Sequence, residues 1–360
     1  MPSLEWHIVK FYRCYERVMY VVDGQKLAAH GRSIGEALRD IYARELQDVY
    51  ALSVTRTGGV CVDYYFDGIE ELQFQYRCDK DSEVEAFVDA YHHVISNVRA
   101  GTRCVDERDR HLDCLVHARI YATRELNGLT PLDSRSADIR EHCPHISSSK
   151  DEIGEFCFQG MDDIGFYLIV PDAHWFEFAA SCGVRTIQLR AKDKPVSEVE
   201  NMVKRCSEIA VRYGVRFIVN DYWELALKYN AYGIHLGQED IKTADLYRIS
   251  SSGIRLGIST HCYHEFARAS FYKPSYIALG PIYDTTSKSM QFHAQGLELL
   301  KQWVKSSSCP VVAIGGITLA NIDDVVRCNA GGVAVISAVT EAADPKDAIR
   351  RFLDKCSVGV

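Results

Sequence analysis

The second half of the chain alternates short apolar runs with amphipathic segments. From Gly165 onward we count eight runs rich in Val and Ile, each followed by a pattern of helical spacing. The runs are FYLIV, VRTIQLR, RFIVN, YGIHLG, RLGIST, YIALGPI, VVAIGG and GVAVIS. Continuous apolar strands are typical of a parallel sheet that is buried on both faces. Eight strand–helix units predict a closed (β/α)₈ TIM barrel over residues 161–360, with an open doubly wound sheet as the alternative.

The first part of the chain follows a different pattern. RVMYVVDGQKLAAHG and ALSVTRTGGVCVDYYF are typical of extended segments with Gly turns. SIGEALRDIYARELQDVY and DSEVEAFVDAYHHVISNVRA are amphipathic and contain early Ser residues that suit an N-cap. The order predicts a small α+β domain of unknown role over residues 1–126. Residues 127–160 are polar, turn-rich and weakly periodic, so we expect a linker there.

Composition and charge narrow the class of protein. The 360 residues leave room for two domains, and 47% apolar with 25% charged residues is an ordinary soluble composition. A net charge of −8 without a basic block argues against a nucleic-acid partner. No apolar run is long enough to span a bilayer, and the N-terminus lacks signal-peptide order. Thirteen scattered Cys without a CxxC pair indicate reduced thiols, so we expect a cytoplasmic protein.

Six His and Cys residues are grouped near the end of the first part of the chain. They are His111, Cys114, His117, His142, Cys143 and His145. Their spacing fits no standard zinc pattern, so we expect an exposed helix followed by the polar linker. The same region has no GxxxxGK or GxGxxG loop, so a fused nucleotide-dependent kinase is not supported.

Polar residues follow the predicted strands, at the end where barrel enzymes hold their active sites. Arg190 and Lys192 follow the second strand, Asp221 follows the third, and Asp240 comes shortly after the fourth. Neighbouring strands lie about 5 Å apart, so both carboxylates can reach one Mg²⁺. Arg190, Lys192 and Lys288 would then hold a pyrophosphate on the same metal. Salt bridges along the rim are the alternative interpretation.

A second anion site is indicated at the last two strands. Gly315 and Gly316 follow the seventh strand and allow the backbone to approach a ligand closely. Ser337 follows the eighth strand and precedes a helix, where backbone N–H groups favour a phosphate. One metal–pyrophosphate site beside one phosphate site suits the joining of two phosphorylated small molecules with loss of pyrophosphate.

Residues 165 to about 356 closely resemble the thiamin phosphate synthase family. The matching stretches are QLRAKD, FIVNDYWELAL, AYGIHLGQED, LGISTH, YIALGPIYDTTSK, VVAIGGI and VAVISA. The resemblance implies a Mg²⁺-dependent transferase with two small-molecule substrates. It would join 4-amino-2-methyl-5-hydroxymethylpyrimidine pyrophosphate to 4-methyl-5-hydroxyethylthiazole phosphate, giving thiamin phosphate and pyrophosphate. The N-terminal part of the chain lies outside this resemblance, and homo-oligomer formation stays open.

The resemblance also implies roles for individual residues. Pyrophosphate ligands are expected at Arg190, Lys192, Asn220 and Lys288, and Mg²⁺ ligands at Asp221 and Asp240. The pyrimidine pocket is expected at Tyr167, Gln188, His235 and Ser259, and the thiazole-phosphate site at Thr285, Ser287, Gly316, Ile336 and Ser337. The catalytic set would be Arg190, Lys192, Lys288 and Ser259. The family loop usually reads Thr-x-Thr-Lys; Ser287 replaces the second Thr here and keeps its hydroxyl.

The expected mechanism is dissociative and carbocation-like, with pyrophosphate leaving before the thiazole nitrogen attacks. Two other functions stay open: a thiazole tautomerase-like enzyme, and a non-catalytic sensor of thiazole or thiamin phosphate. Retention of both carboxylates and all three cations argues against them. His235 lies within a strand and has a plainer interpretation as a hydrogen-bonded core histidine.

Overall fold

The computed structural model describes most of the chain, in two compact units. The described residues are 8–14, 17–28, 33–45, 47–57, 59–78, 84–98, 106–129, 139–148, 156–284 and 292–357. Unit 1 comprises Met1–Ile153 together with Cys262–Phe271, and unit 2 comprises Gly154–His261 together with Tyr272–Val360.

Eight strands form a closed barrel in unit 2, in the order β10-β11-β12-β13-β14-β7-β8-β9. They are β7 (Gly165–Val170), β8 (Thr186–Leu189), β9 (Arg216–Asn220), β10 (Gly233–Leu236), β11 (Arg255–Thr260), β12 (Tyr276–Leu279), β13 (Val311–Ile314) and β14 (Gly332–Val335). Every neighbouring pair is parallel. The predicted barrel is therefore confirmed, and each predicted apolar run overlaps one of its strands.

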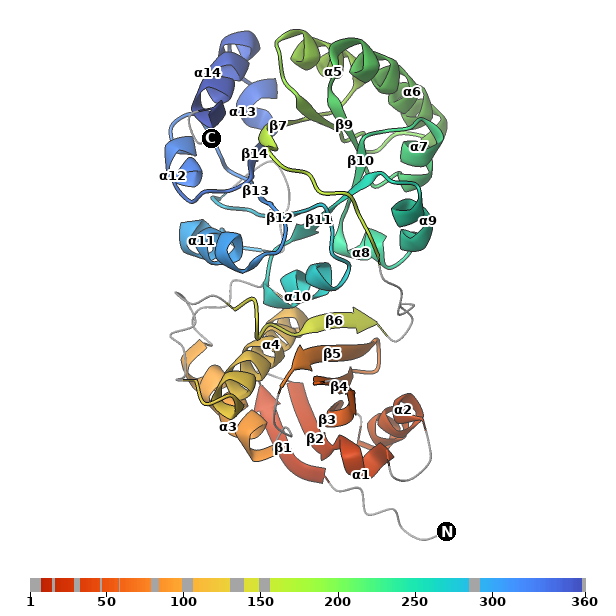
Figure 1. Ribbon diagram of the computed structural model, residues 1–360, viewed down its shortest axis with the longest axis vertical. Coiled ribbons are helices and arrows are strands. Elements are labelled where there is room, and N and C mark those ends of the chain that lie inside the picture. The colour runs from red at the N-terminus through yellow and green to blue at the C-terminus, as the bar shows by residue number, and fades with distance from the viewer. Residues whose placement is uncertain are drawn as a thin grey trace. The chain divides into compact units, whose positions relative to one another are not determined.

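Amphipathic helices follow the strands and surround the barrel (Figure 1). They are α5 (Ala173–Ser181), α6 (Val196–Tyr213), α7 (Trp223–Lys228), α8 (Gln238–Ile241), α9 (Leu246–Ser251), α11 (Gly296–Ser306), α12 (Ile322–Val326), α13 (Ser337–Thr340) and α14 (Pro345–Ser357). In α6, apolar residues at helical spacing, such as Val199, Val203 and Cys206, are buried. The helix ends at Gly214, whose φ of 65° suits the left-handed turn there. Helix α10 (Tyr263–Phe271) follows β11 in the chain and belongs to unit 1.

The barrel interior is packed with apolar and aromatic side chains. Tyr167, Ile218, Tyr276 and Val312 from four strands are buried in one cluster. Gly257 on β11 makes room for the ring of Tyr276, because a Cβ at Gly257 would lie 2.0 Å from the Tyr276 Cζ atom. The phenol hydroxyl of Tyr276 is thereby held inside the barrel.

Unit 1 contains a mixed six-stranded sheet in the order β1-β2-β3-β4-β5-β6. Its strands are β1 (Ile8–Cys14), β2 (Arg17–Asp23), β3 (Asp48–Thr57), β4 (Val60–Phe66), β5 (Glu71–Arg77) and β6 (His145–Ser148). Only the β2–β3 pair is parallel among these described strands. The helices are α1 (Gly24–Ala28), α2 (Ile34–Glu45), α3 (Val84–Val98) and α4 (Glu107–Leu126).

Two features of unit 1 differ from what its sequence pattern predicts. Part of the segment 127–160, expected to be a linker, forms β6, which pairs with the edge of β5 and buries Ile146. Helix α4, expected to be exposed, is buried over most of its length. Its polar side chains find partners there: Arg119 pairs with the buried Asp63, which also accepts hydrogen bonds from the hydroxyls of Tyr50 and Tyr76. Because the buried face of α4 contains charged residues with such partners, its sequence shows no apolar stripe that would predict burial.

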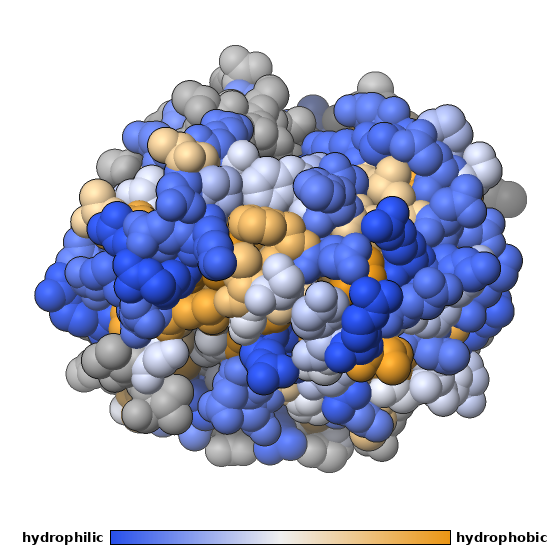
Figure 2. Space-filling model, turned by 90° about the horizontal axis from the view of Figure 1, so that it is seen from above, coloured by the Kyte–Doolittle hydropathy of each residue, from blue (hydrophilic) through white to orange (hydrophobic). Residues whose placement is uncertain are grey.

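The surface of the molecule is mainly hydrophilic on the face shown in Figure 2, where polar side chains surround a smaller hydrophobic area. None of the helices in the described part of the chain is long and apolar enough to cross a membrane.

We predict that Gly257→Ala destabilises the barrel. The added methyl group overlaps the Tyr276 ring, and overpacking of a core costs about 1–3 kcal/mol in free energy of unfolding. Urea unfolding of the barrel transition measures the change. Gly160→Ala is the matched control, since no atom lies within 4 Å of the added Cβ. Equal stability of the two variants would contradict the packing at Gly257.

Candidate active site

Two carboxylates meet at the carboxyl edge of β9 and β10. Asp221 directly follows β9 with φ of 65°, and its backbone N–H donates to the carbonyl of His235 at 3.0 Å. Asp240 lies in the first turn of α8, just after β10, and its Oδ2 accepts the N–H of Gly237 at 3.1 Å. Since β9 and β10 are hydrogen-bonded neighbours, the two acidic side chains lie at the same edge.

The pKa of Asp221 reflects the proximity of the Asp240 carboxylate. Burial, the charge of Asp240 and a hydrogen bond with Asp240 raise the pKa of Asp221 to about 6, against the opposing charges of Arg190 and Lys192. Burial lowers the pKa of Arg190, while the carboxylates of Asp221 and Asp193 oppose that shift. Two crowded carboxylates offer oxygen ligands to a hard divalent cation, which relieves their repulsion. The donor set therefore fits Mg²⁺.

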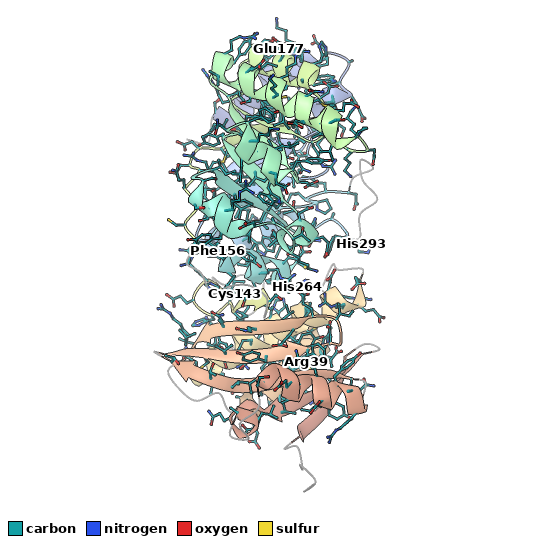
Figure 3. The ribbon with its side chains drawn as sticks, turned by 90° about the vertical axis from the view of Figure 1, so that its right-hand side faces the viewer. Arg39, Cys143, Phe156, Glu177, His264 and His293 are labelled. Atoms are coloured by element: carbon teal, nitrogen blue, oxygen red, sulfur yellow. The ribbon has the colours of Figure 1, made fainter. Side chains whose placement is uncertain are left out.

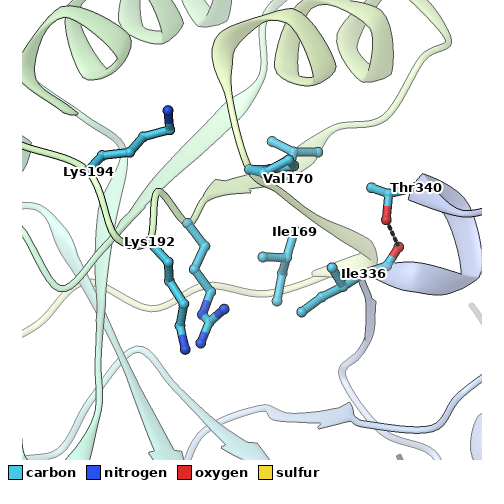
Figure 4. A pocket seen from close by; sticks show the side chains of 8 residues that line it. Ile169, Val170, Lys192, Lys194, Ile336 and Thr340 are labelled. Carbon is cyan, nitrogen blue, oxygen red and sulfur yellow. Dashed lines mark hydrogen bonds between the residues drawn. The ribbon is translucent and has the colours of Figure 1, made fainter. Parts of the chain in front are cut away.

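A cavity of about 310 Å³ opens beside Arg190 and Lys192 (Figure 4). It is lined by Ile169, Val170, Pro171, Arg190, Lys192, Lys194, Ile336 and Thr340. These residues come from the ends of β7, β8 and β14 and from α13. One wall is apolar and the other carries three cations, of which Lys194 pairs with Glu198 at 2.5 Å. The cavity suits a ligand with a flat apolar part and an anionic part.

A chain of hydrogen bonds crosses the barrel below this edge. Gln188 donates through Nε2 to the Tyr167 hydroxyl at 2.8 Å, and that hydroxyl lies 2.9 Å from the hydroxyl of Tyr276. The Tyr276 hydroxyl lies 2.9 Å from Nδ1 of His235, whose Nε2 lies 2.8 Å from Oγ of Ser259. Burial raises the pKa of Tyr167 and of Tyr276, so both hydroxyls stay protonated and neutral. Four residues predicted from the sequence are thus joined in one network.

Tyr276 completes this network and was not among the predicted site residues. It opens the apolar strand YIAL, whose pattern does not indicate polar partners for its hydroxyl. The signal that could have found it is Gly257: a glycine in the neighbouring strand, paired with Tyr276 in register, leaves room for a large ring. Its ring also stacks on that of His235, with centroids 5.6 Å apart.

The remaining predicted residues lie at the same edge or outside the described part of the chain. Asn220 ends β9. Gly316 follows β13 with φ of 66°, and a Cβ there would lie 2.6 Å from the carbonyl oxygen of Asp284. Ile336 and Ser337 follow β14, and Ser337 begins α13. The predictions for Thr285, Ser287 and Lys288 fall on residues 285–291, which lie outside the described residues.

The fold and the edge residues together define a (β/α)₈-barrel protein that carries paired carboxylates and several cations where its strands end. Comparison with known proteins identifies the family. The profile of the family described as Thiamine monophosphate synthase matches residues 166–339. The chain belongs to this family, since it is 46% identical over 191 residues to the thiamine-phosphate synthase of Photorhabdus laumondii, covering 88% of that protein and 53% of this chain.

A further relative and a solved structure support the same family. The thiamine-phosphate synthase of Proteus mirabilis is 46% identical over 192 residues, with 89% of that protein and 53% of this chain covered. The solved structure of thiamine phosphate pyrophosphorylase from Pyrococcus furiosus superposes with a TM-score of 0.51 at 28% identity, covering 98% of that chain and 55% of this one. The family match does not extend to the residues before 166.

We predict that Asp221→Asn makes the metal-free protein more stable at pH 8. The folded-state pKa of about 6 exceeds the unfolded value near 3.8, so ionisation of Asp221 destabilises the fold as pH rises through that interval. Two pKa units correspond to ~2.7 kcal/mol, which partial exposure reduces to about 1–2 kcal/mol.

Urea unfolding in EDTA at pH 4 and pH 8 measures this difference. The gain of the variant over wild type should be present at pH 8 and largely absent at pH 4. In the same series, addition of Mg²⁺ should stabilise only the wild type at pH 8. A variant that is less stable than wild type at both pH values would show that the carboxylates are not crowded.

We predict that Tyr276→Phe weakens the barrel through its hydrogen bonds. The change leaves the buried Tyr167 hydroxyl and Nδ1 of His235 each with one partner fewer, at a cost of about 1–3 kcal/mol in free energy of unfolding. Tyr229→Phe is the control, because its hydroxyl bonds Glu200 at the barrel surface and should change stability by about 0.5 kcal/mol or less. Equal losses in both variants would refute the role of Tyr276.

Proposed function

We propose that this chain catalyses thiamine-phosphate synthesis: transfer of a pyrimidinylmethyl group from its pyrophosphate ester to the nitrogen of a thiazole phosphate. The observation that carries the proposal is the meeting of Asp221 and Asp240 beside Arg190 and Lys192. A site with this balance of charges suits a metal-bound pyrophosphate leaving group. Membership of the thiamine monophosphate synthase family supports the same reaction.

Asp221 and Asp240 would hold Mg²⁺ at the edge of β9 and β10. When bound, Mg²⁺ supplies positive charge that counters the charge growing on pyrophosphate. Arg190 and Lys192 face the same region and would bind the pyrophosphate oxygens, the guanidinium through its paired N–H groups. Asn220, next to Asp221, would donate an amide N–H, and Lys288 is expected to add a further cation.

The residues of the hydrogen-bonded chain would hold the pyrimidine. Gln188, His235 and Ser259 present side-chain donors and acceptors whose positions are fixed by their mutual bonds and by Tyr167. The C–O bond at the pyrimidine methylene breaks, and its electron pair leaves with pyrophosphate. The aminopyrimidine ring delocalises the positive charge left on the methylene carbon. A fixed dipolar pocket stabilises that charge without reorganisation, and the step needs no protein nucleophile.

The thiazole phosphate would be held by the loops after the later strands. Gly316 and Ser337 would bind its phosphate through backbone N–H groups, with Ile336 against the ring and the hydroxyls of Thr285 and Ser287 as further donors. Its ring nitrogen then forms the new N–C bond to the methylene carbon. Because both reactants are held in one cavity, bond formation is effectively unimolecular. This positioning accounts for much of the increase in reaction rate.

The direct test is a pyrophosphate-release assay with both substrates and Mg²⁺. The proposal expects pyrophosphate and thiamin phosphate in equal amounts, and loss of turnover in EDTA. A tautomerase-like enzyme or a sensor would release no pyrophosphate. Asp240→Ala should lower turnover by at least about 100-fold, as removal of an electrostatic group commonly does. Turnover within a few-fold of wild type would rule out the metal assignment.

We predict that Arg190→Ala lowers kcat/KM by about 100-fold or more, because charge on the leaving group is greatest in the transition state. Arg190→Lys should recover only part of this loss, since Lys lacks the paired donors of a guanidinium. Arg185→Ala is the matched control: Arg185 is exposed at the opposite end of β8 and bonds the carbonyl of Tyr213. Similar kinetics for Arg190→Ala and Arg185→Ala would refute the pyrophosphate role.

A further inference from the structure

A cluster of metal-ligating side chains lies in unit 1, apart from the residues of the candidate active site. Asp113 on α4 meets Cys262 and His264, which lie at the start of the segment 262–271 of the same unit. One ligand atom from each residue lies within 4.8 Å of the others. The side chains are nearly fully buried, with exposed fractions of 3% for Asp113 and Cys262 and 6% for His264.

The donor atoms converge on one nitrogen of the imidazole. Nδ1 of His264 lies 3.1 Å from Oδ1 of Asp113 and 3.2 Å from Sγ of Cys262. Ligand atoms around a tetrahedral zinc ion lie roughly 3.3–3.7 Å apart, given bonds of about 2.0–2.3 Å. A small outward movement of the three side chains therefore admits an ion between them. A thiolate, an imidazole and a carboxylate are the ligand types that zinc prefers.

The other ring nitrogen of His264 provides a second, independent observation. Nε2 of His264 lies 3.5 Å from Oδ1 of Asp109, one helical turn before Asp113 on α4. Histidines that bind a metal usually direct their second nitrogen to a carboxylate, which fixes the ring and its tautomer. Because a carboxylate can only accept, Nδ1 donates to Asp113 in the metal-free protein. Against the effect of burial, the hydrogen bond and the charge of Asp113 raise the pKa of His264. Metal binding would release the Nδ1 proton and leave the other proton on Nε2.

The backbone fixes the cluster further. The N–H of His264 donates to Oδ1 of Asp113 at 2.9 Å, which ties the start of α10 to α4 across 151 positions of sequence. Cys143 lies near the same carboxylate, since burial and the charge of Asp113 raise the pKa of its thiol. Figure 3 shows Cys143 and His264 among the side chains of unit 1.

We propose that Asp113, Cys262 and His264 form a structural site for a divalent zinc-class ion in unit 1. Binding releases the protons of the Cys262 thiol and of His264 Nδ1 to solvent, which leaves a thiolate and a neutral imidazole as ligands, and closes the start of α10 onto α4. The site differs from the carboxylate pair in containing sulfur, so it selects softer ions than Mg²⁺. The proposal does not depend on the proposed function.

Cobalt(II) titration of the metal-free full chain tests this site. We expect one thiolate-to-cobalt charge-transfer band, because the carboxylate pair of the active site contains no sulfur, and we expect zinc to displace it. Cys262→Ser should abolish the band. Cys114→Ser, a matched buried thiol on α4 next to Asp113, should keep it. Absence of the band in wild type, its survival in Cys262→Ser, or its loss in Cys114→Ser would overturn the proposal.

Asp109→Asn provides a second variant that keeps all three ligands. It should retain the cobalt band while lowering zinc affinity roughly 10–100-fold, as loss of an outer carboxylate does. An unchanged zinc affinity would contradict the arrangement around Nε2 of His264. Pyrophosphate release should be measured in parallel, since failure of that assay with an intact cobalt band would overturn the proposed function and leave the zinc site standing.

Discussion

Closure of the parallel barrel forces two like charges to share one edge, and the candidate site depends on that constraint. Asp221 and Asp240 are separated by a helix in sequence, yet β9 and β10 are neighbours and both strands end on the same side. The fold alone therefore brings together groups that repel each other, and partial desolvation and the charge of Asp240 both raise the pKa of Asp221. A protein tolerates such a conflict at a functional site, where a bound cation resolves it.

Below the charged edge, the barrel core contains a network of hydrogen-bonded polar side chains that fixes their positions. The hydrogen bonds from Gln188 through Tyr167, Tyr276 and His235 to Ser259 are buried, and each hydroxyl and ring nitrogen has a partner. Satisfied polar networks in a low-dielectric interior are rigid, because breaking any bond leaves an unpaired group. The network thus fixes the floor of the pocket while the edge carries the electrostatics. Unit 1 uses the same principle, with Asp63, Arg119 and two tyrosines buried together.

The sequence predicted what depends on local periodicity and strand order. All eight barrel strands followed from apolar runs, and the meeting of Asp221 with Asp240 followed from their places after neighbouring strands. Tyr276 was missed because its polar partners come from β7 and β10, not from its sequence neighbours. β6 is only four residues long and is stabilised by antiparallel pairing with β5. The burial of α4, like the Asp113–His264 contact across 151 positions, depends on tertiary partners that no local pattern encodes.

The proposed site requires Asp221 and Asp240 to bind one and the same divalent ion. A double-mutant cycle of Mn²⁺ affinity, followed by electron paramagnetic resonance with pyrophosphate present, measures whether they do. A shared ion predicts strong coupling: Asp221→Asn and Asp240→Asn each remove most of the affinity, and the double variant loses little more. Independent, additive losses in the two single variants would contradict a shared ion.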